Sequence, residues 1–258
     1  YSIILKSNKL RIAQCRNLSK NVYIAISELD KINYGEEFTW PLDYQLSVKN
    51  KSEDNLYLLK NNNEIIGYLE YLVISESEYL NILSSKNIIK DYDIQSLVDF
   101  QKGKKNYLIL ESFNVDQKFQ SKESRDLIIK KIKDIIIKSY ENSYKIESIL
   151  AIPFSEFEVD ILTHLNFTKV KDYEKNSLYI LDNRLIENIY LKSESYKRKY
   201  KIIENQQVTE KLLKQVYYLD KKYFKDDYIW PSDYQIKIFN KNPHSMIMVT
   251  YEDELAGY

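Results

Sequence analysis

The sequence has few cysteines, glycines and prolines, and no excess of either charge. Its 258 residues include one cysteine, four glycines and four prolines, with 38 basic and 38 acidic residues. A single cysteine excludes an intrachain disulfide and a cysteine-rich metal site. A net charge of zero removes the electrostatic attraction on which a dedicated nucleic-acid binder depends. Scarce glycine also means that loops must bring the backbone close to a ligand without it.

Long apolar runs are also missing from the sequence. No stretch approaches the roughly 20 consecutive apolar residues of a membrane span, and no signal-peptide pattern opens the chain. We therefore expect a cytoplasmic protein that binds neither a membrane nor a nucleic acid. We expect no metal, because His164 and His244 stand apart from cysteine and from clustered carboxylates. We expect Cys15 to be a small buried residue rather than a nucleophile.

Apolar and aromatic residues are abundant enough for a sizeable core. They make up 44% and 14% of the chain, which excludes global disorder. In the middle, residues 107–115 form an apolar strand pattern, and 117–124 form a polar turn with serines that can cap a helix. Apolar residues then recur at helical spacing through 125–140. A strand that leads into a helix start favours a bound phosphate, since free backbone N–H groups point at it.

The other segments predict a layered α/β or α+β domain of about 185 residues. The order is strand, helix, hairpin, strand, helix, strand, helix and two short strands. Residues 76–105 are polar and charged, and we interpret them as an insertion with a weak helix at 94–100. The further strand patterns lie at 8–17, 55–59, 65–75, 146–153 and within 167–182, and Ser19 and Ser155 can cap helices.

Residues near the C-terminal end repeat the beginning at a constant offset of 190. An ungapped match over 40 positions, from Leu29 to Tyr68, indicates tandem domains. We predict a first domain at 1–185, a linker at 186–200 and the start of a second domain at 201–258. Because the chain opens on Tyr1 and ends on Tyr258 within a strand pattern, we expect it to be part of a longer protein. The paired segments are Leu29-Asp30-Lys31 with Leu219-Asp220-Lys221, Trp40-Pro41 with Trp230-Pro231, Asp43-Tyr44-Gln45 with Asp233-Tyr234-Gln235, and Gly67-Tyr68 with Gly257-Tyr258.

The element order and the strand–turn–helix resemble the GNAT superfamily of N-acetyltransferases. In that family a strand ending in Val precedes a Pro-x-x-Arg/Gln-x-x-Gly-x-Gly/Ala turn that holds the pyrophosphate of acetyl-CoA. Val115 and Gln120 fit this pattern, but Gln117 replaces the Pro, and Glu123 and Arg125 replace the glycines. Gly67 matches a glycine common in the earlier strand, and Leu165-Asn166-Phe167 matches a Leu-x-Phe ending. Leu162 departs from the family, which has a Tyr general acid at that position.

The resemblance implies a mixed, mostly antiparallel central sheet flanked by helices, and an acetyl transfer from acetyl-CoA to a small-molecule or peptide amine. It implies direct attack of the amine, with Glu111 in the central strand as the general base. Trp40 and Tyr44 would face the acceptor. The residues expected to bind acetyl-CoA are Phe113, Val115, Gln120, Ser121, Lys122, Glu123, Ser124 and Arg125.

Other interpretations of the same residues stay open. Glu111 could be a half-exposed strand residue paired with a lysine, and the recurrence of Trp40 and Tyr44 in the repeat favours a structural role. Glu123 places a negative charge beside the expected pyrophosphate, while Arg125 can offset it. The missing glycines, Glu123 and Leu162 favour a catalytically degenerate module that scaffolds or regulates. A third reading keeps the fold but uses another acyl or aminoacyl donor.

Overall fold

The computed structural model describes residues 10–14, 18–52, 54–88, 92–204, 208–223, 229–242, 247–251 and 254–258. Two compact units divide the chain, one from Tyr1 to Tyr190 and one from Leu191 to Tyr258. Helix α6 (Asn183–Lys199) covers most of the predicted linker. None of the helices in the part that the structure describes is long and apolar enough to cross a membrane. Cys15 and the second histidine, His244, lie outside the described residues.

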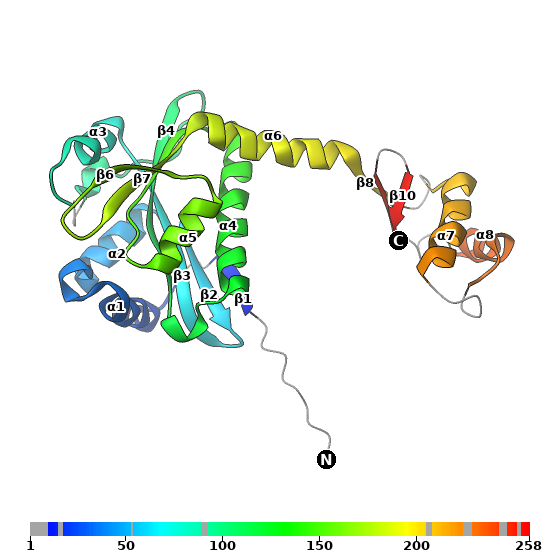
Figure 1. Cartoon of the computed structure of the whole chain (residues 1–258), viewed down its shortest axis with the longest axis horizontal. Helices are drawn as coiled ribbons and strands as arrows, with labels where there is room; N and C mark the ends of the chain where they lie inside the picture. Colours follow the sequence, from blue (N-terminus) through cyan, green and yellow to red (C-terminus); the bar gives the residue numbers. More distant parts are fainter. Residues whose placement is uncertain are drawn as a thin grey trace, which may run out of the picture. The chain divides into compact units, whose positions relative to one another are not determined.

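Unit 1, residues 1–190, is built on one seven-stranded sheet (Figure 1). Its neighbouring strands are antiparallel except for β4 and β5, which are parallel. The predicted α/β architecture with a mixed, mostly antiparallel sheet is therefore confirmed. In spatial order the strands are β1 (Leu10–Gln14), β2 (Leu56–Asn61), β3 (Glu64–Ile74), β4 (Lys105–Val115), β5 (Lys145–Ala151), β7 (Ser177–Asp182) and β6 (Thr168–Asp172).

Helices cover both faces of this sheet (Figure 1). Apolar residues of α4 (Lys122–Glu141) and α5 (Glu156–His164) pack on one face, where Ile128, Ile132 and Leu162 are buried. On the other face α1 (Lys20–Tyr34), α2 (Leu42–Lys51) and α3 (Glu76–Ser84) pack in two clusters. Successive residues of the central strands are buried on opposite faces, as the pleat requires. The core therefore lies in two layers, one on each side of the sheet.

The predicted helix at 94–100 is wrong. Only Ile94–Ser96 forms a single 3-10 turn, and the next residue, Leu97, pairs with Ile74 at the end of β3. The helix of this segment is instead α3. It begins directly after Ser75, whose hydroxyl accepts a hydrogen bond from the Glu78 backbone N–H. The Ser75 N-cap explains where α3 starts, and the pairing of Leu97 with Ile74 explains why 94–100 does not form a helix.

Glycine is required at Gly67 in β3. A Cβ on this residue would lie 2.4 Å from the backbone oxygen of Asn114 in β4. No side chain fits at that distance, so β3 and β4 can pair here only around glycine. The predicted strand glycine therefore has a packing reason.

Unit 2, residues 191–258, has a three-stranded antiparallel sheet in the order β10-β9-β8. Its elements follow those of β1 to β3 with each start shifted by 190 residues, or by 191 for β9. The pairing is shifted in the same way, since Leu10↔Asn61 in unit 1 corresponds to Tyr200↔Tyr251 in unit 2. The elements are β8 (Tyr200–Glu204), α7 (Glu210–Tyr223), α8 (Ser232–Lys241), β9 (Ile247–Tyr251) and β10 (Glu254–Gly257).

Candidate functional site

The site of unit 1 begins where β4 and β5 stop pairing. Their last parallel pair is Leu110↔Ala151, although β4 continues to Val115. Beyond this pair, the described strand partners of β4 come from β3 alone. The carboxyl half of β4 therefore keeps one open edge, with unpaired backbone groups that can meet an extended ligand.

A β-bulge in β4 lies at the start of this open edge. Glu70 pairs with Ser112, but the next residue of β3, Tyr71, pairs with Leu110, so Glu111 is the extra residue. A bulge breaks the alternation of faces, which turns both Glu111 and Ser112 toward the helix α1 side of the sheet. Both residues line the same cavity there.

This cavity holds about 50 Å³ and lies among α1, α2, β3, β4 and the segment after β5. Three carboxyl groups line it, from Asp30, Glu70 and Glu111, and none of the described residues that line it is Lys, Arg or His. Its walls are largely aromatic. The aromatic lining residues are Tyr23, Tyr34, Phe38, Trp40, Tyr68, Tyr92 and Phe154.

Glu111 is held by a tyrosine. The Tyr92 hydroxyl makes a hydrogen bond to the Glu111 side chain, and burial, followed by the negative charge of Glu111, raises the pKa of Tyr92 well above its ordinary value. Tyr92 therefore stays a proton donor to this carboxylate. The Tyr44 hydroxyl in turn donates to the Tyr92 backbone oxygen at 2.7 Å.

Trp40 and Tyr44, the two residues predicted to face the acceptor amine, have different positions. Trp40 lines the cavity. The Tyr44 ring packs edge-on against the Trp40 ring, with centroids 4.9 Å apart, and the Tyr44 hydroxyl bonds to the backbone of Tyr92. The corresponding pair in unit 2, Trp230 and Tyr234, has its rings 5.4 Å apart in the same edge-on arrangement. Since the pair recurs, its packing contributes to the structure as well as to the cavity wall.

Asp30 lies at the buried end of the cavity, with 6% of its surface exposed. Its Oδ1 accepts hydrogen bonds from the Tyr68 hydroxyl at 2.6 Å and from Asn114 Nδ2 at 3.2 Å. Burial, which outweighs these two bonds, raises the pKa of Asp30 to about 7. Burial and the nearby Asp30 also raise the pKa of Glu70 to about 8. Both groups can therefore exchange a proton near neutral pH.

Tyr34 links β4 to α5 beside the open strand edge. Its hydroxyl donates to Glu158 Oε1 at 2.8 Å and lies 3.0 Å from the Ser112 hydroxyl. Glu158 Oε2 accepts the backbone N–H of Phe154 at 2.6 Å, and the Phe154 ring packs on that of Tyr34. Burial raises the pKa of Glu158 to about 7 despite these bonds. This cluster was not predicted from the sequence, where its one local signal is the capping spacing from Ser155 to Glu158.

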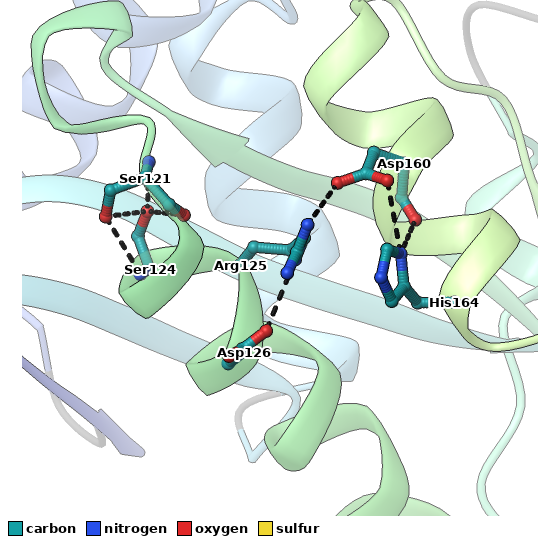
Figure 2. Close-up of polar contacts among 6 residues, drawn as sticks. All are labelled: Ser121, Ser124, Arg125, Asp126, Asp160 and His164. Carbon is teal, nitrogen blue, oxygen red and sulfur yellow. Dashed lines mark hydrogen bonds and ion pairs between the residues drawn. The ribbon is translucent and has the colours of Figure 1, made fainter.

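The polar turn before α4 closes on itself (Figure 2). Ser121 and Ser124 form a capping box, in which the Ser121 hydroxyl accepts the Ser124 N–H and the Ser124 hydroxyl accepts the Ser121 N–H. Among the described residues, none accepts a hydrogen bond from the backbone N–H of Lys122 or Glu123. These two donors stand at the positive end of a 20-residue helix.

Arg125 is engaged by carboxylates. Its guanidinium lies 2.7 Å from Asp160 Oδ2 and 3.2 Å from Asp126 Oδ1, and Asp160 also contacts His164 (Figure 2). The hydrogen bond to Asp160 raises the pKa of Arg125, which is charged in any case. A phosphate would have to compete with two carboxylates for this side chain.

The remaining predicted ligand residues point elsewhere. Phe113 and Val115 are both 1% exposed and belong to the core under α4, so only their backbone can meet a ligand. Gln120 uses its side-chain amide to bond the Val115 backbone oxygen at 3.0 Å. The predicted residues thus divide between the cavity, which contains Glu111 and Trp40, and the α4 start. Within the described residues no group of His, Cys, Asp and Glu is arranged to hold a metal.

Comparison with solved structures identifies the fold. The GNAT-like decarboxylase GphF, solved in complex with isobutyryl-CoA, aligns with a TM-score of 0.51 at 11% identity, over 67% of this chain and 100% of that one. The fold is that of the GNAT acyltransferases. The loading GNATL domain of CurA from Lyngbya majuscula aligns with a TM-score of 0.49 at 10% identity, over 69% and 99% of the two chains. No family model and no curated protein sequence matches the chain.

Proposed function

We propose that unit 1 transfers an acetyl group from acetyl-CoA to an amine by direct attack. The observation that carries this proposal is the open edge of β4, which leads straight into the start of α4. An extended pantetheine chain suits an unpaired strand edge, and a pyrophosphate suits free helix N–H groups. The GNAT fold supports an acyl-CoA, because GphF, with the same fold, was solved with isobutyryl-CoA.

The α4 start fits a pyrophosphate in part. Lys122 and Glu123 offer their backbone N–H groups, and the side chains of Lys118 and Lys122 add positive charge. The capping box removes two further donors, and Arg125 is shared with Asp126 and Asp160. The expected affinity is therefore lower than that of a glycine-rich turn with all its N–H groups free.

Glu111 is the proposed general base. It lines the cavity at the bulge, next to the point where the strands separate, and Tyr92 holds it in place. In the reaction Glu111 accepts a proton from the ammonium, so that the nitrogen can form its bond to the acyl carbon as the carbon–sulfur bond breaks. Of the two protons lost by nitrogen, one ends on sulfur and one in solvent.

Release of free thiol from acetyl-CoA tests the proposal. The chain is incubated with acetyl-CoA and a panel of primary amines, and both the thiol and the acetylated amine are measured. We expect thiol and acetyl-amine to appear in equal amounts. Hydrolysis without acetyl-amine, or no thiol at all, would contradict transfer to an amine.

A non-catalytic module is the second candidate. It is favoured by Leu162, which is fully buried in the core at the place of the family's acid tyrosine, and by the carboxylates that occupy Arg125. In this case the cavity binds a ligand but no thiol is released. The thiol assay therefore separates the two candidates.

We further propose that unit 2 is the start of a second copy of the same domain. The support is the shared element order, the shared pairing register and a recurring polar contact. Asp30 accepts the Tyr68 hydroxyl in unit 1, and Asp220 accepts the Tyr258 hydroxyl in unit 2. Domain bounds of 1–185 and 201–258, joined through residues 186–200, remain our prediction.

A further inference from the structure

Three hydrogen-bond acceptors of the cavity in unit 1 lack a donor among the described residues. Gln45 is 7% exposed, and its Oε1 is buried without a partner. Both bonds to Asp30 reach Oδ1, which leaves Oδ2 without one. No hydrogen bond contributes to the environment of the Glu70 carboxyl, which is governed by burial and by Asp30. All three side chains line the same cavity.

Unit 2 shows that the amide nitrogen of this glutamine can satisfy the aspartate, although Gln235 Oε1, like Gln45 Oε1, is buried without a partner among the described residues. There the Gln235 amide, the counterpart of Gln45, donates to Asp220 Oδ2 at 3.0 Å. In unit 1 the Gln45 amide donates instead to the Trp40 backbone oxygen at 3.3 Å. Asp30 Oδ2 therefore lacks the amide partner that its counterpart has. An acceptor that has lost its partner on folding is unfavourable unless a ligand supplies the donor.

The charge of the cavity favours a cation as that donor. Asp30, Glu70 and Glu111 line it without a basic residue among the described lining residues. Aromatic rings such as Trp40 and Phe154 form its walls, and their faces attract a cation. An anionic ligand would be repelled by these carboxyl groups, and a neutral ligand would gain nothing from their charge.

We propose that the cavity binds one primary ammonium group, whose three N–H donors are shared among Asp30 Oδ2, Gln45 Oε1, the Glu70 carboxylate and Glu111, the proposed proton acceptor. That this ammonium is the amine end of the acceptor rests on the proposed function. The volume of about 50 Å³ admits only a few non-hydrogen atoms. The amine must therefore sit on an unbranched end, with no carboxylate near it.

Ammonium binding should release protons near neutral pH. Burial raises the pKa of Glu70 to about 8, so this carboxyl is mostly protonated in the free protein at pH 7. An alkylammonium stays charged there and favours the carboxylate form, so Glu70 loses its proton as the ligand binds. The other titratable groups that line the cavity are Asp30 from α1, Glu111 from β4, and Tyr23, Tyr34, Tyr68 and Tyr92.

Calorimetric titration of the whole chain with simple amines, without acyl-CoA, tests this proposal. Propylamine should bind at least tenfold more tightly than N,N,N-trimethylpropylammonium, propanol or β-alanine. These ligands lack the N–H donors, lack the charge, or add a carboxylate. Equal affinity for propylamine and the trimethyl analogue would overturn the proposal.

The Glu70→Gln variant tests the named carboxyl, with Glu64→Gln as the matched control, because Glu64 is an exposed glutamate of the same strand. We expect Glu70→Gln to weaken propylamine binding at least tenfold and to lower proton release, measured in buffers of different ionisation enthalpy. Glu64→Gln should change neither. If Glu70→Gln fails to fold, the titrations of the wild type with propylamine and its analogues still test the ammonium site. Amine binding without acetyl-CoA binding would contradict the proposed function but not the proposed ammonium site.

Discussion

At the scale of single residues, the account depends on Glu111. We predict that Glu111→Gln lowers kcat for acetyl transfer about 100-fold or more, because the cavity loses its base. The affinity for acetyl-CoA should not change, since the Glu111 side chain lines the cavity and only the β4 backbone is expected to meet the pantetheine. Steady-state rates together with acetyl-CoA titration check both statements. Unchanged turnover, as expected for the exposed control Glu64→Gln, would remove Glu111 from the mechanism.

The sequence allowed only some of these residues to be predicted. Glu111 could be placed in the central strand, but its direction depends on a bulge that appears only when β3 and β4 are paired. Tyr34 contacts Ser112 and Glu158, which are 78 and 124 positions away. No local pattern indicates contacts of this length. Asp30 was visible as part of the repeat, but its burial beside Tyr68 was not.

At the scale of elements, the start of α4 both stabilises the helix and offers the proposed phosphate site. The Ser121 hydroxyl accepts the Ser124 N–H and thereby caps the start of α4. We predict that Ser121→Ala lowers the free energy of unfolding by about 1 kcal/mol, the usual effect of removing an N-cap. Urea denaturation followed by circular dichroism measures this change. A loss within error of zero would mean that the capping box does not stabilise the helix.

Helix α5 controls the charge available at that start. Asp160 on α5 holds Arg125 together with Asp126, so Asp160→Asn should remove one of the two carboxylates that compete with a phosphate. We predict that acetyl-CoA binds roughly twofold to fivefold more tightly to this variant, as expected from an exposed ion pair. The same titration on the double variant Arg125→Ala, Asp160→Asn should show no gain. A weaker affinity for Asp160→Asn would contradict a phosphate role for Arg125.

Element prediction succeeded where local signals were strong. The long helix and the hairpin followed from apolar spacing and from an Asn-rich turn, and both are present. The weak helix at 94–100 failed, because Leu97 pairs with β3 rather than with its own neighbours. The position of the β4–β5 separation could not be predicted, since it depends on which strands are adjacent.

At the scale of the whole molecule, two buried carboxyl groups and a partly buried one make stability depend on pH. Burial raises the pKa of Asp30 and Glu158 to about 7 and that of Glu70 to about 8. The folded state therefore holds protons that the unfolded state releases above about pH 4. The stability that these groups contribute is complete below that pH and is lost as pH rises through 7 and 8.

We predict that the Tm of unit 1 falls between pH 5 and pH 8, with each group contributing at most about 1.4 kcal/mol per pH unit. Differential scanning calorimetry across this range measures the slope. Glu70→Gln should give a shallower fall than the wild type, because one of the three groups no longer titrates. A Tm that is flat or rising over this range would show that these three carboxyl groups are not protonated in the folded state.

The central claim is that unit 1 binds acetyl-CoA along β4 and at the start of α4, and calorimetric titration of acetyl-CoA tests it most directly. The account predicts saturable binding, weakened when the Lys122–Glu123 donors are disturbed by Lys122→Pro, which removes one backbone N–H at a helix position that tolerates proline. Free acetate, without the nucleotide, should give no heat. No heat and no thermal shift with millimolar acetyl-CoA would contradict the account.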